Sequence, residues 1–168
     1  MSTLQTLTPH RIMEWLEHVP DPEIPVISVV DLGIIRDVVW DGSTCTVTIT
    51  PTYSGCPAMD QITTDVVAAL QARGITDVRV ETRLSPAWTT DWLSDKGRQA
   101  LKGFGIAPPA EQAIDVSAIA RRDSTLQGSC PLCGSGQTRL GSHFGSTPCK
   151  ALYRCTACGE PFDYFKAH

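Results

Sequence analysis

Cys56 stands at a point in the chain where local geometry can activate a thiol. A strand-like run ends at Thr50 and a helix-like run begins at Pro57, a residue type suited to the first helical position because its missing N–H is not needed there. This order predicts Cys56 as the helix N-cap. A thiol at that position faces unpaired backbone N–H groups and the positive end of the helix dipole. Both favour the thiolate, the form that attacks electrophiles and binds metal.

Four further cysteines have the spacing of a metal site. They form two Cys-x-x-Cys pairs with 21 residues between them, and a glycine that permits a tight turn follows each pair: Cys130, Cys133, Cys155 and Cys158. Four thiolates with tetrahedral reach are typical of a structural zinc site, although a rubredoxin-like iron centre uses the same ligands. We expect zinc, because a closed four-sulfur ribbon is usually structural.

Two other thiols fall outside that set. A strand predicted over residues 150–154 separates Cys149 from Cys155, and six strand residues span about 20 Å. One metal ion cannot bind at both ends of such a strand, so Cys149 is either a partly buried structural cysteine or a second functional thiol. Cys45 alternates with Val47 and Ile49 in a strand-like run and is expected to be a small buried hydrophobic residue.

Composition limits the class of protein. The chain of 168 residues has a formal net charge of −4, with −6 in residues 1–124 and +2 in residues 125–168, and no basic face that would favour nucleic acid. No apolar run approaches the 18 residues of a membrane helix, and the first residues lack signal-peptide architecture. We therefore expect a cytoplasmic protein without a nucleic-acid or membrane partner. Five of the seven cysteines lie in the last 39 residues, which favours metal ligation over disulfides.

The elements that must position Cys56 follow from periodicity and turn signals. Thr8 and Pro9 begin a predicted helix, and three prolines between residues 20 and 25 make an irregular loop. Strand-like runs flank an Asp41-Gly42 turn, a helix follows Cys56, a third strand covers residues 77–84, and a short helix falls within residues 89–105. The order predicts an α+β fold, in which a small three-stranded sheet carries helices on one face.

The domain division follows from composition. Residues 8–109 form the predicted α+β domain, residues 110–128 a linker with a short helix near residues 116–122, and residues 129–168 a C-terminal zinc ribbon. The aromatic segment 160–165 either completes the hairpin of the ribbon or forms an aromatic docking patch.

Several of these motifs resemble a known family. The segments 21–25, 31–33, 54–57, 86–92 and 105–109 resemble the MIP-type domain of iron–sulfur assembly factors. The tail segments 144–147, 149–155 and 160–166 are similar to those of the D subunits of bacterial ring 1,2-phenylacetyl-CoA epoxidases, which belong to aerobic phenylacetate catabolism. In this tail Ala167 stands where relatives usually carry a cysteine, and the sequence leaves open whether it is natural or engineered.

The resemblance implies a role in maturing or maintaining metal centres. The partners it implies are the di-iron oxygenase and [2Fe–2S] reductase components of the epoxidase, together with the iron–sulfur assembly machinery. The important cysteine of the family maps onto Cys56, which is then expected to bind iron or the edge of an iron–sulfur cluster. Common clusters need four ligands. The site is therefore shared with another protein, formed in a homodimer, or completed by Cys149. Asp21, Glu23 and Asp31 either add oxygen ligands or act only as turn-forming and capping carboxylates.

Two alternatives remain open at this point. The ribbon could serve as a protein-docking module of the epoxidase complex without metal transfer. The chain could instead be a thiol-dependent enzyme, but a catalytic cysteine normally needs a base. None of the four histidines lies near Cys56 in sequence, so we assign no catalytic residue: His10, His18, His143 and His168.

Overall fold

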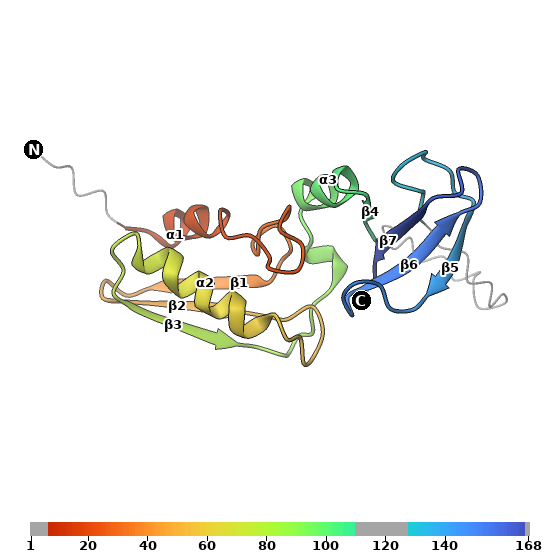
Figure 1. The fold of residues 1–168 in the computed structure, drawn as a ribbon. Helices are drawn as coiled ribbons and strands as arrows, with labels where there is room; N and C mark the ends of the chain where they lie inside the picture. Colours follow the sequence, from red (N-terminus) through yellow and green to blue (C-terminus); the bar gives the residue numbers. More distant parts are fainter. Residues whose placement is uncertain (1–6, 110–127, 167–168) are drawn as a thin grey trace, which may run out of the picture. The chain divides into compact units, whose positions relative to one another are not determined.

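A computed structural model describes residues 7–109 and 128–166 (Figure 1). The chain divides into two compact units, residues 1–97 and residues 98–168. The predicted linker helix near residues 116–122, together with Ala167 and His168, lies outside the described residues.

The first unit contains the predicted three-stranded sheet, in the order β1-β2-β3. Strands β1 (Ile35–Trp40) and β2 (Thr44–Ile49) are antiparallel, and β3 (Asp77–Thr82) pairs in parallel with β2 after the crossover helix α2 (Met59–Gln71). The Asp41-Gly42 turn is confirmed. The Asp41 carboxylate accepts hydrogen bonds from the backbone N–H groups of Ser43 and Thr44 at 2.8 and 2.7 Å.

Helix α1 (Pro9–Leu16) and helix α2 provide the apolar layer against this sheet. Thr8 caps α1 by accepting from the Arg11 N–H, as the Thr8-Pro9 signal predicted. Helix α1 contacts both α2 and β1, and α2 contacts β3, which gives the α+β layers of Figure 1. Cys45 is fully buried within β2, as expected for a small hydrophobic residue. The longest described helix has 13 residues, well short of the roughly 20 that a membrane span requires.

The proline-rich loop is joined to the C-terminal part of this unit by one carboxylate. The Asp31 side chain accepts from the Ser94 hydroxyl at 2.7 Å and from the Ser28 hydroxyl at 2.9 Å, and it lies 3.3 Å from the Lys96 Nζ. Ser94 directly precedes helix α3 (Asp95–Gly103), which follows the short 3-10 helix η1 (Thr90–Trp92), and Lys96 lies in the first turn of α3. Asp31 therefore fixes the loop against the segment that leads into α3.

This arrangement predicts acid-sensitive stability. Burial raises the pKa of Asp31, but the hydrogen bonds from Ser94, Ser28 and Lys96 outweigh it and hold the pKa below its ordinary value. Since the folded-state pKa is depressed, the stabilisation is present above the unfolded pKa and is lost as pH falls through the folded pKa. We expect Asp31→Asn to lower the free energy of unfolding by about 1–3 kcal/mol at pH 7. In urea titrations from pH 7 to 3, the difference in the free energy of unfolding between Asp31→Asn and wild type should disappear. A difference that stays constant over this range would contradict an effect of the Asp31 charge.

The second unit is a four-stranded sheet in the order β4-β7-β6-β5. Strands β5 (Thr138–Ser142), β6 (Lys150–Cys155) and β7 (Pro161–Phe165) form an antiparallel meander, so the aromatic segment 160–165 does complete the hairpin. Strand β4 (Ile106–Ala107) adds in parallel to β7, so two residues that the sequence analysis assigned to the first domain belong to the sheet of the ribbon. The core of this sheet is small: Ala107, Cys130, Ala151, Tyr153, Cys155 and Phe162.

Candidate functional site

Cys56 lies in a turn before helix α2 rather than at its N-cap. Helix α2 begins at Met59 with Ala58 as the N-cap residue, so the predicted capping position was wrong by two residues. The N–H of Cys56 donates to the Tyr53 carbonyl, and the Cys56 carbonyl accepts from the Met59 N–H, both at 3.3 Å. Pro57 therefore starts a separate turn that leads into the helix, a position that its fixed φ suits as well as the first helical one.

The environment of the Cys56 thiol raises its pKa. Burial is the main cause, and the negative charges of Glu23 and Asp21 add to it, while hydrogen bonds from the Ala58 N–H and the Tyr53 side chain act in the opposite direction. The expectation that the helix end favours the thiolate is thus wrong, because burial and nearby carboxylates outweigh the backbone donors. At neutral pH Cys56 is a thiol, and a metal ion must displace its proton in order to bind.

Two of the three predicted carboxylates act on Cys56, and the third has other partners. Asp21 is buried, with 4% of its surface exposed, and its Oδ1 accepts from the N–H groups of Glu23 and Ile24 at 3.0 and 2.8 Å. It therefore forms a turn and also places negative charge near the thiol. Asp31 is hydrogen-bonded within the loop as described above. Ligation of metal by Asp21 or Glu23 remains a prediction.

The sequence analysis missed the hydroxyl groups of the loop. The Tyr53 side chain acts to lower the pKa of the Cys56 thiol, and the buried residues Thr50 and Thr52 lie in the same segment with 1% and 7% of their surface exposed. A run of polar residues between a strand and a cysteine was the available signal. It is ambiguous, because the same residue types are common in ordinary turns.

The electrostatics of this loop predict opposite changes in thiol reactivity for two substitutions. Glu23→Gln removes a like charge, so it should lower the Cys56 pKa and speed alkylation by iodoacetamide at pH 8 about two- to threefold. Tyr53→Phe removes a hydrogen bond that favours the thiolate, so it should slow the same reaction. Alkylation of Cys56 is followed by peptide mass spectrometry, with Glu81→Gln on the exposed side of β3 as the matched control. Equal alkylation rates for wild type and the three variants would contradict the effects that we assign to Glu23 and Tyr53 on the pKa of Cys56.

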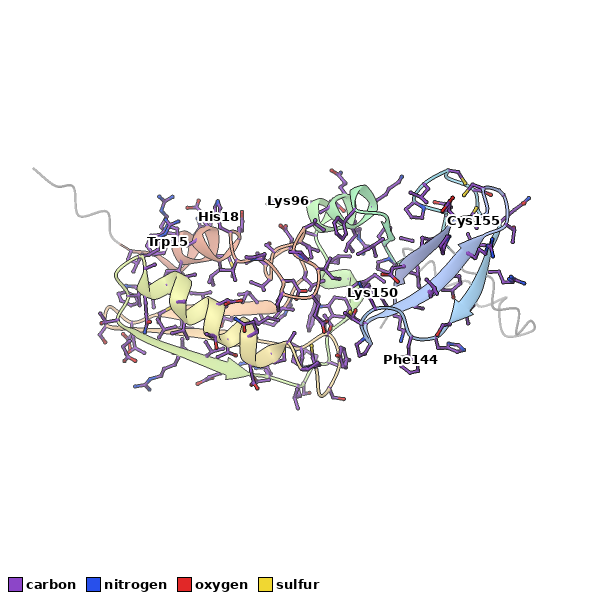
Figure 2. The ribbon with its side chains drawn as sticks, viewed as in Figure 1. Trp15, His18, Lys96, Phe144, Lys150 and Cys155 are labelled. Carbon is purple, nitrogen blue, oxygen red and sulfur yellow. The ribbon has the colours of Figure 1, made fainter. Side chains whose placement is uncertain are left out.

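The four knuckle cysteines converge on one point in the second unit, and Figure 2 labels one of them, Cys155. Their Sγ atoms all lie within 4.8 Å of one another, with 3.9 Å between Cys130 and Cys158 and 3.6 Å between Cys133 and Cys155. A tetrahedron with Zn–S bonds of about 2.3 Å has edges of about 3.8 Å, so the set fits zinc. Gly134 and Gly159 adopt φ values of 76° and 81° and donate to the carbonyls of Cys130 and Cys155, which closes each knuckle turn.

Backbone donors lower the pKa of one thiol in this group but not of all four. The backbone N–H of Cys158 is the main cause that lowers the pKa of Cys155, to about 7, against the opposing effect of burial. At Cys158 a backbone hydrogen bond from Glu160 acts in the same direction, but burial and the neighbouring cysteines outweigh it and raise the pKa to about 12. In the described ranges 7–109 and 128–166, these four cysteines are the one group of three or more potential ligands close enough to share an ion.

Cys149 lies outside this set, as the strand argument predicted. It precedes β6, whereas Cys155 ends that strand. Its thiol is buried, with 3% of the residue exposed, and lies 3.0 Å from the Thr147 hydroxyl. This environment is that of a structural cysteine, and a functional role for Cys149 remains a prediction.

Comparison with known proteins finds two family matches in this chain. Residues 9–82 match the family described as iron-sulfur cluster assembly protein, and residues 115–166 match the PaaD zinc beta ribbon domain. A curated protein of Escherichia coli strain K12, named as the D subunit of a putative 1,2-phenylacetyl-CoA epoxidase, is 46% identical over 169 residues, which cover 99% of both chains. An Fe-S protein maturation auxiliary factor of Porphyromonas gingivalis is 40% identical over 100 residues, covering 58% of this chain and 92% of that protein.

A solved structure supports the fold of the first unit. The crystal structure of a domain of unknown function, DUF59, from Bacillus anthracis aligns with a TM-score of 0.52 and 30% sequence identity. The alignment covers 55% of this chain and 90% of that one.

Proposed function

The chain belongs to the family of the putative 1,2-phenylacetyl-CoA epoxidase D subunit, and from that premise we propose that it delivers or maintains iron or iron–sulfur centres of such an epoxidase. The names of its relatives support a maturation or accessory role. We further propose that Cys56 is the thiol that handles the metal and that the protein is an accessory factor rather than an enzyme in its own right.

The observation that carries the proposal is the setting of the Cys56 thiol. It is partly buried, receives hydrogen bonds from Tyr53 and Ala58, and is close enough to Asp21 and Glu23 to feel their charge. Carboxylates raise the local affinity for a cation, and a thiolate suits iron. A protonated thiol surrounded by negative charge is poorly suited to nucleophilic attack but suits reversible binding of a cationic cargo.

The chemistry of loading and release is ligand exchange. An Fe–S bond forms between Cys56 Sγ and the incoming iron as the S–H proton passes to solvent. On release, a thiolate of the recipient replaces the Cys56 sulfur, which takes up a proton again. No electrons are transferred in either step. One thiolate and two carboxylates do not complete the four ligands that a cluster needs. A partner protein, a second copy of the chain or Cys149 therefore supplies the rest.

The proposed partners are the oxygenase and reductase components of the epoxidase and the iron–sulfur assembly machinery, in the cytoplasm. In this scheme the zinc ribbon has a structural part, because its four cysteines satisfy zinc without Cys56 or Cys149. Zinc is the resident metal and iron the transient cargo.

The deciding experiment is anaerobic reconstitution with ferrous iron and sulfide. Wild type and Cys56→Ser are compared with Cys45→Ala, which removes a buried thiol from β2 and serves as the matched control. We expect one zinc per chain in all three proteins. Iron and sulfide beyond that should fall at least about tenfold in Cys56→Ser alone. In cells that lack the native gene, Cys56→Ser should fail to restore epoxidase activity. Full restoration by Cys56→Ser would overturn the proposal.

A docking module without metal transfer is the second candidate function. The observation that favours it is the small sheet of the second unit, whose core includes two of the four cysteines that fit a metal ion. In that case wild type and Cys56→Ser support epoxidase activity equally, and zinc-ligand variants do not. A thiol-dependent enzyme is disfavoured, because burial and carboxylates raise the pKa of Cys56.

A further inference from the structure

The open face of the ribbon sheet carries two arginines in direct opposition. Arg139 on β5 and Arg154 on β6 are cross-strand partners in an antiparallel pair. Like charges at such positions repel each other and destabilise the pair. Arg154 donates from Nε to the Gly159 carbonyl at 2.9 Å, and within the described part of the chain neither guanidinium has a carboxylate partner. Among the described residues, therefore, no carboxylate neutralises this pair of like charges.

Protection of the sheet edge explains only one of these residues. Strand β5 ends the sheet, with β6 as its one neighbour among the described residues, and a charged side chain such as Arg139 is a usual means of discouraging aggregation at an edge. Arg154 lies on the inner strand β6, where edge protection is not needed. Compensation for the zinc thiolates is a second explanation, because Arg154 precedes Cys155, and zinc analysis of the arginine variants tests it directly.

Apolar and small residues surround the arginine pair. A hollow in the described ribbon is lined by residues of β5, β6 and β7: Arg139, Leu140, Gly141, Leu152, Tyr153, Arg154 and Pro161. Leu152 leaves 39% of its surface exposed there. Gly141 has no side chain to cover the edge backbone, and an added Cβ would lie 3.3 Å from the Leu152 carbonyl oxygen. The backbone that approaches Gly141 closely is that of Leu152 on β6, at the register shift between Leu140 and Ser142.

The connection between β5 and β6 is rigidly built beside this face. Lys150 is buried, with 5% of its surface exposed, and its Nζ lies 3.3 Å from Asp163 Oδ2, which also accepts from the Ser146 hydroxyl (Figure 2). Lys166 donates to the Pro148 carbonyl and lies 4.5 Å from the centre of the Phe144 ring, which is 69% exposed. A buried ion pair is costly and is best explained by the conformation that it specifies. Here it fixes a loop that presents an aromatic ring and a third cation to solvent.

We propose that this face of the ribbon, defined by Arg139, Gly141, Leu152 and Arg154, binds an acidic, extended segment of a partner protein along the edge of β5, which pairs with no further strand among the described residues. Carboxylates of the segment pair with the two guanidinium groups, its backbone pairs with β5, and an apolar side chain packs on Leu152. A protein segment is favoured over a phosphate ligand because the hollow lies on an open sheet edge. It has neither the glycine-rich loop nor the helix N-terminus that usually holds a phosphate. This inference does not depend on metal handling by Cys56.

The test uses the zinc-loaded full chain and fluorescein-labelled peptides. The probe alternates acidic and apolar residues, Asp-Ile-Glu-Leu-Asp-Ile-Glu, and its control replaces every acid by the matching amide. Binding is measured by fluorescence anisotropy for wild type, Arg139→Glu, Arg154→Glu and the conservative pair Arg139→Lys and Arg154→Lys. Arg83→Glu, an exposed arginine of the first unit, is the matched control.

We expect the acidic peptide to bind more tightly than its amide control and the affinity to fall about tenfold with each reversal to Glu. The fall should be smaller with Lys, because a lysine keeps the charge but not the bidentate geometry, and absent in Arg83→Glu. Hydrogen exchange should show new protection of the β5 amides in the complex. Cys56→Ser should bind the peptide as wild type does, which separates this result from that of the metal experiment.

Several results would overturn the proposal. Equal affinities for the acidic and amide peptides would show that the arginines do not recognise the carboxylates of the segment. Loss of zinc in Arg139→Glu or Arg154→Glu, measured by elemental analysis, would assign the arginines to the thiolate centre instead. Preferential binding of a thymidine oligonucleotide would indicate a phosphate-reading surface. A salt-sensitive dimer of the chain that the Glu variants abolish would make a second copy the occupant.

Discussion

Replacing Cys155 with serine is expected to remove the zinc and to unfold the ribbon, while the sheet of the first unit keeps its hydrogen-exchange protection. Cys155 is fully buried, belongs to the group of four cysteines whose spacing fits a metal ion, and is a member of the ribbon core. That core is small, and units of about 40 residues rarely fold without a metal, disulfides or association. Binding of structural zinc stabilises comparable peptides by about 10–16 kcal/mol, so loss of one ligand should cost more than about 4 kcal/mol.

The matched control is Cys149→Ser at the other end of the same strand. Both cysteines are buried, but only Cys155 belongs to the group of four sulfurs. Zinc content and the exchange rates of the β6 amides are measured for both variants, and for wild type before and after treatment with a chelator. We expect chelated wild type to resemble Cys155→Ser and to refold when zinc is restored. Retention of zinc by Cys155→Ser, or its loss from Cys149→Ser, would reassign the ligand set.

The features that the sequence predicted well are those in which one local pattern determines the structure. Alternating Cys45, Val47 and Ile49 identified β2, Asp41-Gly42 identified the hairpin, and the two Cys-x-x-Cys pairs identified the metal site. In each case the pattern has one low-energy arrangement, because burial of one face or tetrahedral ligation excludes the others.

The features that it missed depend on contacts between distant segments. Strand β4 has only two residues, and pairing with β7 alone defines it. The raised pKa of Cys56 comes from burial and from Glu23 and Asp21, which lie more than 30 positions earlier in the chain. Likewise Asp31 and Asp21 look equivalent in sequence. The first is engaged by Ser94 and Lys96, whereas the second acts on the thiol. The tertiary structure decides which groups these carboxylates contact, and a local sequence pattern does not contain that information.

Gly33→Ala is expected to be among the most destabilising single substitutions in the first unit. Gly33 adopts a φ of 76°, a left-handed conformation that costs an L-residue about 1–2 kcal/mol. An added Cβ would also lie 2.6 Å from the Trp92 carbonyl oxygen and 2.7 Å from the Trp92 Cβ. The first of these atoms belongs to the backbone of η1, so a rotamer change cannot relieve the clash. We expect a loss of about 3 kcal/mol or more in the free energy of unfolding.

The contacts around Gly33 explain why relief is difficult. The Trp88 indole N–H donates to the Leu32 carbonyl at 3.0 Å, and the Arg36 guanidinium lies 3.4 Å from the centre of the Trp92 ring. The residues on either side of Gly33 are therefore held, Leu32 by Trp88 and Arg36 by Trp92, and the loop that leads to Gly33 carries Asp21 and Glu23. Displacing it should move their charges relative to Cys56, so the alkylation rate of Cys56 should change together with stability.

Gly42→Ala separates the two components of this effect. Gly42 also has a positive φ, 100°, but an added Cβ there would meet no atom within 4 Å. This variant should therefore show backbone strain alone, a loss of about 1–2 kcal/mol, and an unchanged alkylation rate of Cys56. Urea unfolding and iodoacetamide labelling of both variants supply the measurements. Equal losses of stability in Gly33→Ala and Gly42→Ala would mean that η1 moves away from the added Cβ without a cost in free energy. The close packing of the Asp31-Leu32-Gly33 segment against Trp92 could then not be what positions the carboxylates beside the thiol.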